Sequence, residues 1–160
     1  ALGNRSILAD PRRPEMKDEI NKKVKFREEF RPFAPSVLEE RAMDLFDMDT
    51  PSPFMTITYP VRSEWREKLG AVTHVDGTAR VQTISRETNP RFHGLVREFG
   101  AISSVPVVLN TSFNTRGEPI VETPLDAVRT FNGTGIDALF IGDFVVSKPA
   151  RARFVEHRIS

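Results

Sequence analysis

The 160-residue chain has the size of one ordinary protein domain, with 39% hydrophobic and 28% charged residues. It contains no apolar run of the roughly 20 residues that cross a bilayer, no cysteine for disulfide or thiolate chemistry, and a formal net charge of only +1. These properties argue against a membrane protein and a strong overall field for nucleic acid, and they favour a single cytoplasmic domain over residues 1–160.

The positive charge is concentrated in the first part of the chain. Residues 1–31 contain nine Lys or Arg and six Asp or Glu, an excess larger than that of the whole chain. The opening sequence ALGNRSILADPRR has neither an initiator methionine nor a signal-peptide pattern, and its apolar residues look like an element already under way. We therefore expect the chain to be a portion of a longer protein.

The first half of the chain predicts short elements. Pro14 suits the first turn of a helix, and the acids followed by lysines over 15–23 suit the rest of it. Alternation of apolar and basic residues predicts a strand at 24–27, followed by a turn. Further along, we expect a strand from 36 to 38, a short helix over 40–46, a loop, and a strand at 54–59.

The second half mixes helices and strands. Two strand-like stretches flank Asp76-Gly77, which predicts a hairpin turn. Asn89-Pro90 introduces a helix that ends near Gly100, and Thr123-Pro124 introduces another. Buried or paired strands are expected at 105–109, 138–141 and 144–146. The mixed order predicts an α/β or α+β fold.

Two segments carry a pair of polar groups around one phenylalanine: Lys25-Phe26-Arg27 and Ser112-Phe113-Asn114. If both segments are extended, the polar side chains of each share a face and the phenylalanines point the other way. An ammonium, a guanidinium, a hydroxyl and an amide then converge above an apolar floor. Such a site suits phosphate and a small planar anion.

Each segment also has a simpler interpretation. The basic run, which includes Arg31, also fits a solvated edge that Glu28 and Glu29 neutralise, although the Pro-Phe-Ala-Pro sequence after Arg31 favours a rigid, partly buried setting. The sequence around Ser112 and Asn114 also fits a loop whose side chains cap their own backbone.

Other chemistry is weakly indicated. His74 and Asp76 would share a strand face and suit acid–base work or a metal, but no His or Cys cluster predicts a dedicated transition-metal site. Aromatic residues alternate with basic ones near Lys25, yet the low net charge disfavours an oligonucleotide track, so nucleic acid is not an expected partner.

Five sequence blocks, in order along nearly the whole chain, resemble the carboxyl-terminal domain of the O-carbamoyltransferases that decorate nodulation factors and antibiotics. The blocks are ALGNRSILADPR, MKDEINKKVKFREEFRPFAPSVLEE, THVDGTARVQT, VLNTSFNTRGEPIVETPLDAV and DALFIGDFVV. That domain is similar to the YrdC-like, or threonylcarbamoyl-AMP synthase, fold, in which helices pack on a twisted mixed sheet. Its KxR and SxN signatures, which line the nucleotide pocket, match residues 25–27 and 112–114.

The resemblance implies chemistry in two steps. Carbamoyl phosphate is hydrolysed to phosphate and carbamate, and a carbamate oxygen then attacks the α-phosphorus of ATP, so that pyrophosphate leaves and carbamoyladenylate forms. Mg²⁺ accompanies the ATP, and a separate amino-terminal acyl-transfer domain passes the carbamoyl group to a hydroxyl. These steps need anions held together against their repulsion rather than a protein nucleophile.

On this basis we expect catalytic roles for Lys25, Arg27 and Arg80. The wider substrate-binding set neutralises phosphate and carbamate oxygens with Lys25, Arg27, Arg31 and Arg80, and orients the nucleotide or carbamoyl group with Asn110, Ser112 and Asn114. Arg5 and Arg116 are outer candidates.

One departure from the family affects the expected activity. The family's opening block usually reads Gly-Pro-Arg before Ala-Leu-Gly, whereas this sequence starts at the alanine. Because that arginine and the amino-terminal domain with its metal site are outside the sequence, we expect the chain to bind or activate carbamoyl phosphate without completing the transfer. The alternative is a YrdC-like module that binds a nucleotide, RNA or a protein partner without independent catalysis.

Overall fold

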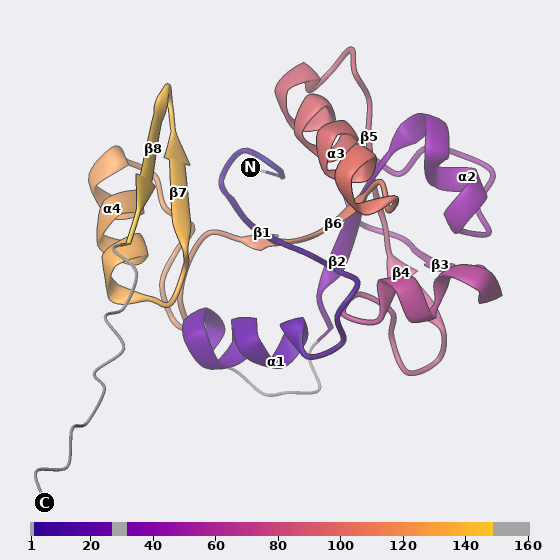
Figure 1. Ribbon diagram of the computed structural model, residues 1–160, viewed down its shortest axis with the longest axis horizontal. Helices are drawn as coiled ribbons and strands as arrows, with labels where there is room; N and C mark the ends of the chain where they lie inside the picture. Colours follow the sequence, from indigo (N-terminus) through magenta and orange to yellow (C-terminus); the bar gives the residue numbers. More distant parts are fainter. Residues whose placement is uncertain (1, 27–31, 149–160) are drawn as a thin grey trace, which may run out of the picture.

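A four-stranded mixed sheet forms the centre of the computed structural model, which describes residues 2–26 and 32–148 (Figure 1). The strand order is β1-β6-β2-β5; β6 runs antiparallel to both neighbours, and β2 and β5 are parallel. The four strands are β1 (Ser6–Ala9), β2 (Ala34–Leu38), β5 (Gln82–Ile84) and β6 (Val107–Ser112). Helices packed on a mixed sheet confirm the predicted α+β class.

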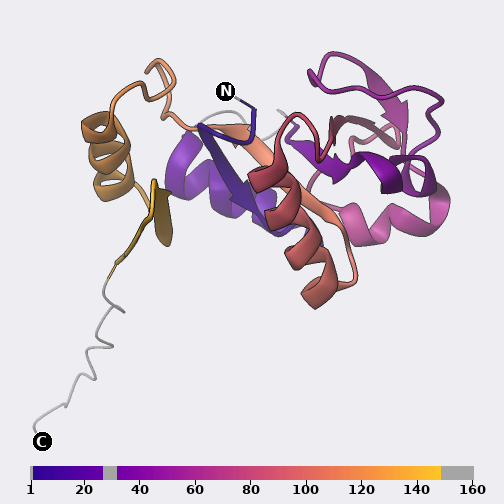
Figure 2. The same cartoon turned by 90° about the horizontal axis from the view of Figure 1, so that it is seen from above.

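The central strand β6 is apolar on both faces because the sheet lies between two cores. Val107 and Leu109 point into the larger core together with Ile20, whereas Val108 joins a second cluster with Phe92 and others. Side chains of a strand alternate between faces, so one run of branched apolar residues supplies both cores. The second cluster is covered by α3 (Pro90–Ser103), which lies across the sheet from α1 (Met16–Ile20) (Figure 2).

The segment after α1 is helical, so the predicted strand at 24–27 is wrong for Val24 and Lys25. A π-helical turn spans Asn21–Lys25 and ends at Phe26, whose φ of 47° is left-handed. Val24 lies one helical turn after Ile20, and both are buried in the same core. A four-residue alternation of apolar and basic residues was too short to distinguish a strand from one helical face.

The segment 54–59 is also mostly not a strand. Only β3 (Thr58–Pro60) is extended, and it pairs antiparallel with β4 (Thr78–Arg80). Before it, Met55 has a φ of 57°, which interrupts any strand despite the β-forming residues. Gly77 does form the predicted turn, at a φ of 80°, but only the stretch that follows is a strand, and its partner is β3.

The remaining predicted elements follow the predicted order: a 3-10 turn (Glu39–Arg41) leading into α2 (Ala42–Leu45), then α4 (Pro124–Gly133), β7 (Ala138–Ile141) and β8 (Phe144–Ser147). Two further 3-10 turns, Ser63–Trp65 and Glu67–Leu69, were not predicted from the sequence. The β7–β8 hairpin and α4 form a unit at one end of the molecule (Figure 1). Within the described residues, no helix is both long and apolar enough to cross a membrane.

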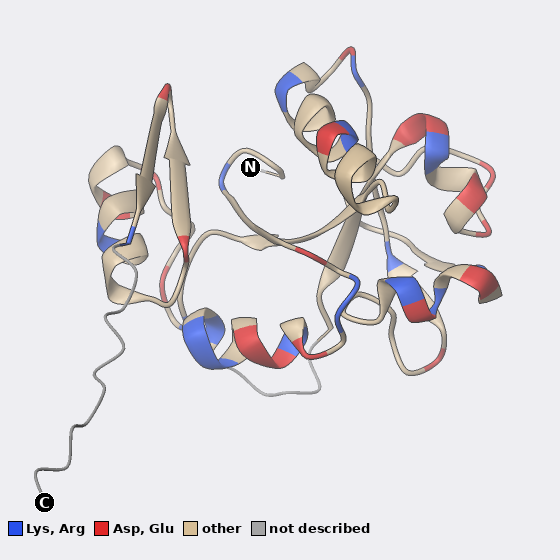
Figure 3. Ribbon diagram, viewed as in Figure 1, with Lys and Arg blue, Asp and Glu red and all other residues tan. Residues whose placement is uncertain are grey.

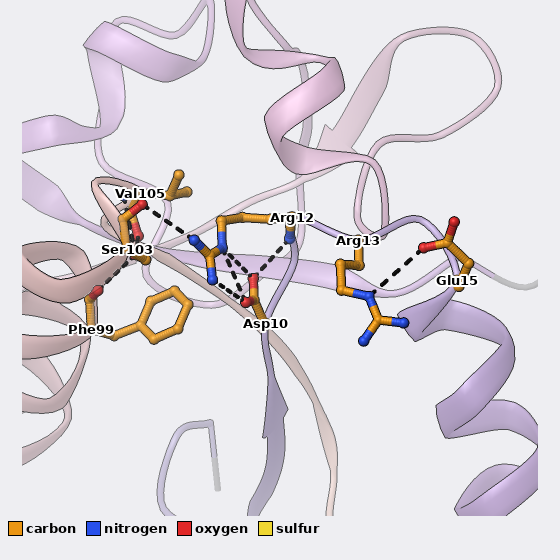
Figure 4. A network of polar contacts seen from close by, with 7 residues as sticks. All are labelled: Asp10, Arg12, Arg13, Glu15, Phe99, Ser103 and Val105. Atoms are coloured by element: carbon orange, nitrogen blue, oxygen red, sulfur yellow. Dashed lines mark hydrogen bonds and ion pairs between the residues drawn. The ribbon is translucent and has the colours of Figure 1, made fainter.

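A polar network fixes the chain as it leaves β1 (Figure 4). The Arg12 guanidinium donates hydrogen bonds to both carboxylate oxygens of Asp10 and to the carbonyl of Ser103 at the end of α3. The hydrogen bonds from Arg12 hold the pKa of Asp10 below its usual range. This network connects the start of the chain to α3.

Ion pairs neutralise part of the excess positive charge at the start of the chain. Glu19 in α1 accepts from Arg13 and from Lys23, and Figure 3 shows acidic and basic residues side by side along this helix. Such exposed pairs contribute little stability, but they reduce the local positive field. The basic residues of α1 and its flanks therefore do not by themselves form an electropositive surface.

Candidate functional site

A cavity of about 240 Å³ lies where β1, β2 and β6 meet the end of β4. Its polar lining comes from Arg5, Ser6, Arg80, Asn110, Thr111 and Ser112, and its apolar lining from Leu2, Pro32, Phe33, Ala34, Met55 and Ile120. No Asp or Glu is among these described lining residues. The cavity therefore combines cations and neutral polar groups with an apolar wall.

Two arginines from separate elements make the cavity electropositive. Arg80 ends β4 and is exposed, and its backbone is held opposite Thr58 of β3. Arg5 lies directly before β1, where its Nη1 donates to the carbonyl of Val121 at 3.0 Å and its own carbonyl accepts from Phe113. Guanidinium groups bind phosphate and carboxylate through two parallel hydrogen bonds. The pair thus suits an anionic ligand.

Asn110 sits on the cavity wall in a fixed orientation. It is almost fully buried, and its Nδ2 donates to Ser36 Oγ at 2.9 Å and to Gln82 Oε1 at 3.0 Å. Ser36 Oγ in turn donates to Gln82 Oε1 at 2.6 Å, so the network joins β6, β2 and β5. Because both amide hydrogens are used there, the Asn110 side-chain oxygen is the group left to accept a hydrogen bond from a ligand.

Lys25 holds the end of β6 without lining the cavity. Its side chain is buried, and Nζ donates to the carbonyls of Ser112 at 2.6 Å and Asn114 at 3.0 Å, with the two side-chain oxygens at 3.2 Å and 2.8 Å. Ser112 Oγ also donates to Asn114 Oδ1 at 2.6 Å. A single ammonium therefore fixes the polar segment that follows the strand.

The structure brings only part of the predicted set together. Arg80, Asn110 and Ser112 line the cavity, as does the outer candidate Arg5, whereas Lys25 and Asn114 do not line it but contact Ser112. Arg116 is not part of the lining and donates to the Phe26 carbonyl. Arg27 and Arg31 lie outside the described residues, and no finding tests the assigned roles, which stay predictions.

Neither phenylalanine of the predicted apolar floor lines the cavity. Phe113 is buried in the main core, while Phe26 is 52% exposed and has a left-handed backbone conformation. The sequence interpretation also missed Ser36, Gln82 and Met55. Ser36 and Gln82 are polar residues inside otherwise apolar strands, a pattern that signals a buried network. No sequence signal identified Met55.

His74 and Asp76 are related through a third residue rather than by a shared strand face. Thr78 Oγ1 donates to Asp76 Oδ1 at 2.7 Å and therefore accepts from His74 Nδ1 at 3.1 Å. Burial, together with the positive charges of Arg80 and Lys17, lowers the pKa of His74. His74 Nε2 is buried without a hydrogen-bond partner, and the described residues contain no group of three metal-binding side chains.

Comparison with known proteins places this chain in a family. The sequence model for the carbamoyltransferase C-terminus matches residues 1–148. The chain belongs to this family. Among its relatives, nodulation protein NolO of Bradyrhizobium diazoefficiens is 52% identical over 92% of this chain, and an uncharacterized protein of Synechocystis is 48% identical over 94%. Nodulation protein U of Bradyrhizobium diazoefficiens is 47% identical over 73%.

The family assignment confirms the resemblance found in the sequence. The matched region is only one part of the longer relatives. The chain spans 28% of the length of nodulation protein NolO and of the Synechocystis protein. The aligned part contains Arg80, Asn110 and Ser112, since the family match extends from residue 1 to residue 148. The cavity of this chain therefore lies within the part that the family model matches.

Proposed function

We propose that this chain is the activating domain of an ATP-dependent O-carbamoyltransferase, which forms carbamoyladenylate from carbamoyl phosphate and ATP. The single observation that carries the proposal is the cavity, which places two arginines, an oriented amide and a hydroxyl together in a member of the carbamoyltransferase C-terminus family. Water hydrolyses carbamoyl phosphate to phosphate and carbamate. A carbamate oxygen then forms a bond to the α-phosphorus of ATP as the bond to pyrophosphate breaks.

The lining residues suit this reaction because its reactants are anions. Arg80 and Arg5 offer guanidinium groups to phosphate and carbamate oxygens and offset the repulsion between them. The free side-chain oxygen of Asn110 accepts from the carbamoyl amino group, a donor that the methyl group of acetyl phosphate does not replace. Lys25 keeps Ser112 in place, and Arg27 and Arg31 remain proposed contributors outside the described residues.

Magnesium enters this proposal only as the companion of ATP. Among the described residues, the lining of the cavity offers no carboxylate, the ligand that Mg²⁺ prefers in proteins. The described lining therefore does not fit a protein-held magnesium site, and no step is assigned to the ion. Transfer of the carbamoyl group to a hydroxyl belongs, in the proposal, to the larger part of the relatives that this chain does not span.

Carbamoyladenylate formation tests the proposal directly. The chain is incubated with ATP, Mg²⁺ and carbamoyl phosphate, and pyrophosphate and carbamoyladenylate are measured, alongside thermal protection by each ligand. We expect pyrophosphate release that requires carbamoyl phosphate. Absence of turnover together with absence of protection by either ligand contradicts the proposal.

Arg80→Ala supplies the matched variant for that assay. Removing a guanidinium that contacts phosphate costs about 1.5–3 kcal/mol, which corresponds to a roughly 10- to 100-fold weaker affinity for carbamoyl phosphate. Arg86→Ala is the control, because Arg86 is an exposed arginine on the same stretch of chain that does not line the cavity. Equal affinities in the two variants remove Arg80 from the site.

A further inference from the structure

A short arch beside Arg80 forms one wall of the cavity. The 53–57 arch begins after Ser52, which is buried and is pinned by Oγ to the Val81 carbonyl at 3.1 Å and by its backbone to Thr83. It ends at Thr58, which pairs with Arg80 across the β3–β4 ladder. Both ends of the arch are therefore fixed to the residues that carry Arg80.

The arch holds Met55 in an unfavourable backbone conformation. Met55 has a φ of 57°, in the left-handed region that side chains other than Gly, Asn and Asp rarely adopt. Strained residues persist where the surrounding structure determines them, and they gather at ligand sites. The conformation coincides with the contact of Met55 with the cavity.

The arch is apolar, yet the core does not cover it. Phe54 is 74% exposed and Ile57 is 52% exposed, while Met55 is partly exposed where it lines the cavity. Apolar burial in the core therefore does not explain why the arch adopts this shape. The hydrogen bonds of Ser52 fix the position where the arch begins. The arch then presents an apolar surface next to Arg80.

A ligand that fills such a cavity is charged at one end and apolar at the other. Met55 shares the apolar lining with Leu2, Pro32 and Ile120, while Arg5 and Arg80 supply the charge. Nucleotides have this division, because the phosphates are anionic and the base is a flat heteroaromatic ring whose faces pack well against apolar side chains. A methionine side chain makes favourable contacts with such rings through its polarizable sulfur.

We propose that the 53–57 arch is the base-binding wall of the cavity and that Met55 contacts the purine ring of ATP. This inference rests on the proposed function, which brings ATP to the cavity. It assigns to Met55 a specificity-determining role that depends on the base and not on the phosphates.

The methionine methyl groups report on this contact directly. The chain contains four methionines, Met16, Met43, Met48 and Met55, so methyl ¹³C labelling gives four signals. With ATP we expect the Met55 methyl to shift through the ring current of the purine, whereas inorganic tripolyphosphate leaves it nearly unmoved. Met43, which is 49% exposed on α2 and does not line the cavity, is the internal control.

Met55→Gly separates binding from folding. Glycine adopts the left-handed conformation without strain, so we expect an unfolding midpoint close to the original value. Loss of the thioether should weaken ATP binding about fivefold or more and leave tripolyphosphate binding unchanged. Met43→Ala should alter neither affinity.

The outcomes distinguish this inference from the proposed function. Binding of ATP with an unmoved Met55 methyl, or with full affinity in Met55→Gly, overturns the base-binding role and leaves the proposed function intact. If neither ATP nor carbamoyl phosphate binds the original chain, the proposed function fails and the inference fails with it.

Discussion

Lys25 shows how one residue can serve a site without lining its cavity. The ammonium has three protons, and four oxygens of Ser112 and Asn114 lie within 3.2 Å of it. Two of these oxygens are backbone carbonyls, so the lysine fixes the chain itself as it leaves β6. A role for Lys25 in holding substrate stays a prediction; its contacts already give it a positioning role.

Replacement of Lys25 by methionine should therefore lower stability. Lys25→Met keeps the length of the buried stem but removes the ammonium from the carbonyls of Ser112 and Asn114, and of these two only the Ser112 carbonyl keeps another donor among the described residues, the Asn114 amide at 3.1 Å. Hydrogen bonds to a charged group contribute about 1.5–3 kcal/mol, and because these acceptors are only partly buried we expect the free energy of unfolding to fall by about 1–2 kcal/mol. Urea unfolding followed by circular dichroism measures this change.

Lys23→Met is the matched control for that measurement. Lys23 lies two residues earlier and makes an exposed ion pair with Glu19 at 3.0 Å. Pairs of this kind contribute about 0–1 kcal/mol. If both variants unfold at the same urea concentration, Lys25 does not hold the end of β6.

At the scale of elements, the segments with strong end signals were the ones that the sequence predicted. Asn89-Pro90 and Thr123-Pro124 mark the starts of α3 and α4, and both Asn89 and Thr123 accept a hydrogen bond from the first turn. The predicted strand at 105–109 is displaced to Val107–Ser112, which carries it to the polar residues themselves. Local capping chemistry can be read from sequence because it involves residues three apart.

The elements that were predicted wrongly depend on contacts with residues far away in the sequence. Residues 54–57 have high strand propensity, but they form no strand. Ser52 is hydrogen-bonded to residues 81 and 83, and the left-handed backbone of Met55 interrupts the extended conformation that pairing requires. Lys25 becomes helical because Val24 packs into a core that includes Leu109. The same limit applies to the cavity. Arg5, Arg80 and Asn110 were candidates because their side chains suit anions or carbamoyl groups. Met55 was not a candidate, since its position at the cavity depends on a left-handed backbone turn.

The capping box of α4 provides a test at this scale. Thr123 Oγ1 accepts from the Asp126 amide at 3.2 Å, and Asp126 Oδ2 accepts from the Thr123 amide at 2.9 Å. Thr123→Ala removes the first bond and should cost about 1 kcal/mol in the free energy of unfolding, whereas Thr123→Ser should cost much less. Thermal unfolding of both variants measures the difference.

The same variants test whether α4 is separate from the cavity. Neither α4 nor the β7–β8 hairpin supplies a lining residue. Thr123→Ala should therefore leave the affinity for carbamoyl phosphate unchanged at temperatures well below unfolding. A weaker affinity in Thr123→Ala, with Thr123→Ser unaffected, contradicts this separation.

For the whole molecule, the cavity exists only because distant parts of the chain fold together. Its described lining comes from residues 2, 5–6, 32–34, 55, 80, 110–112 and 120. Most of these positions lie on strands or next to strand ends, where the backbone is held by pairing on both sides. The site therefore depends on the pairing of segments that are far apart in the sequence.

His74 should link global stability to pH. Burial, opposed by Asp76 but assisted by Arg80 and Lys17, places the pKa of His74 below its ordinary value of 6.5. Between the folded pKa and 6.5 the unfolded chain binds more protons than the folded one, so the free energy of unfolding rises with pH in that window. The contribution of His74 is fully present above 6.5 and is lost as the pH falls below it.

His74→Asn isolates this effect, because its side-chain amide replaces Nδ1 as donor to Thr78 without a titrating group. Urea unfolding at intervals between about pH 7.5 and pH 5 compares the two chains, and all other titrations cancel in their difference. We expect the original chain to lose more stability than His74→Asn as the pH falls. Parallel curves contradict the assignment, since they mean that His74 titrates equally in the folded and unfolded states.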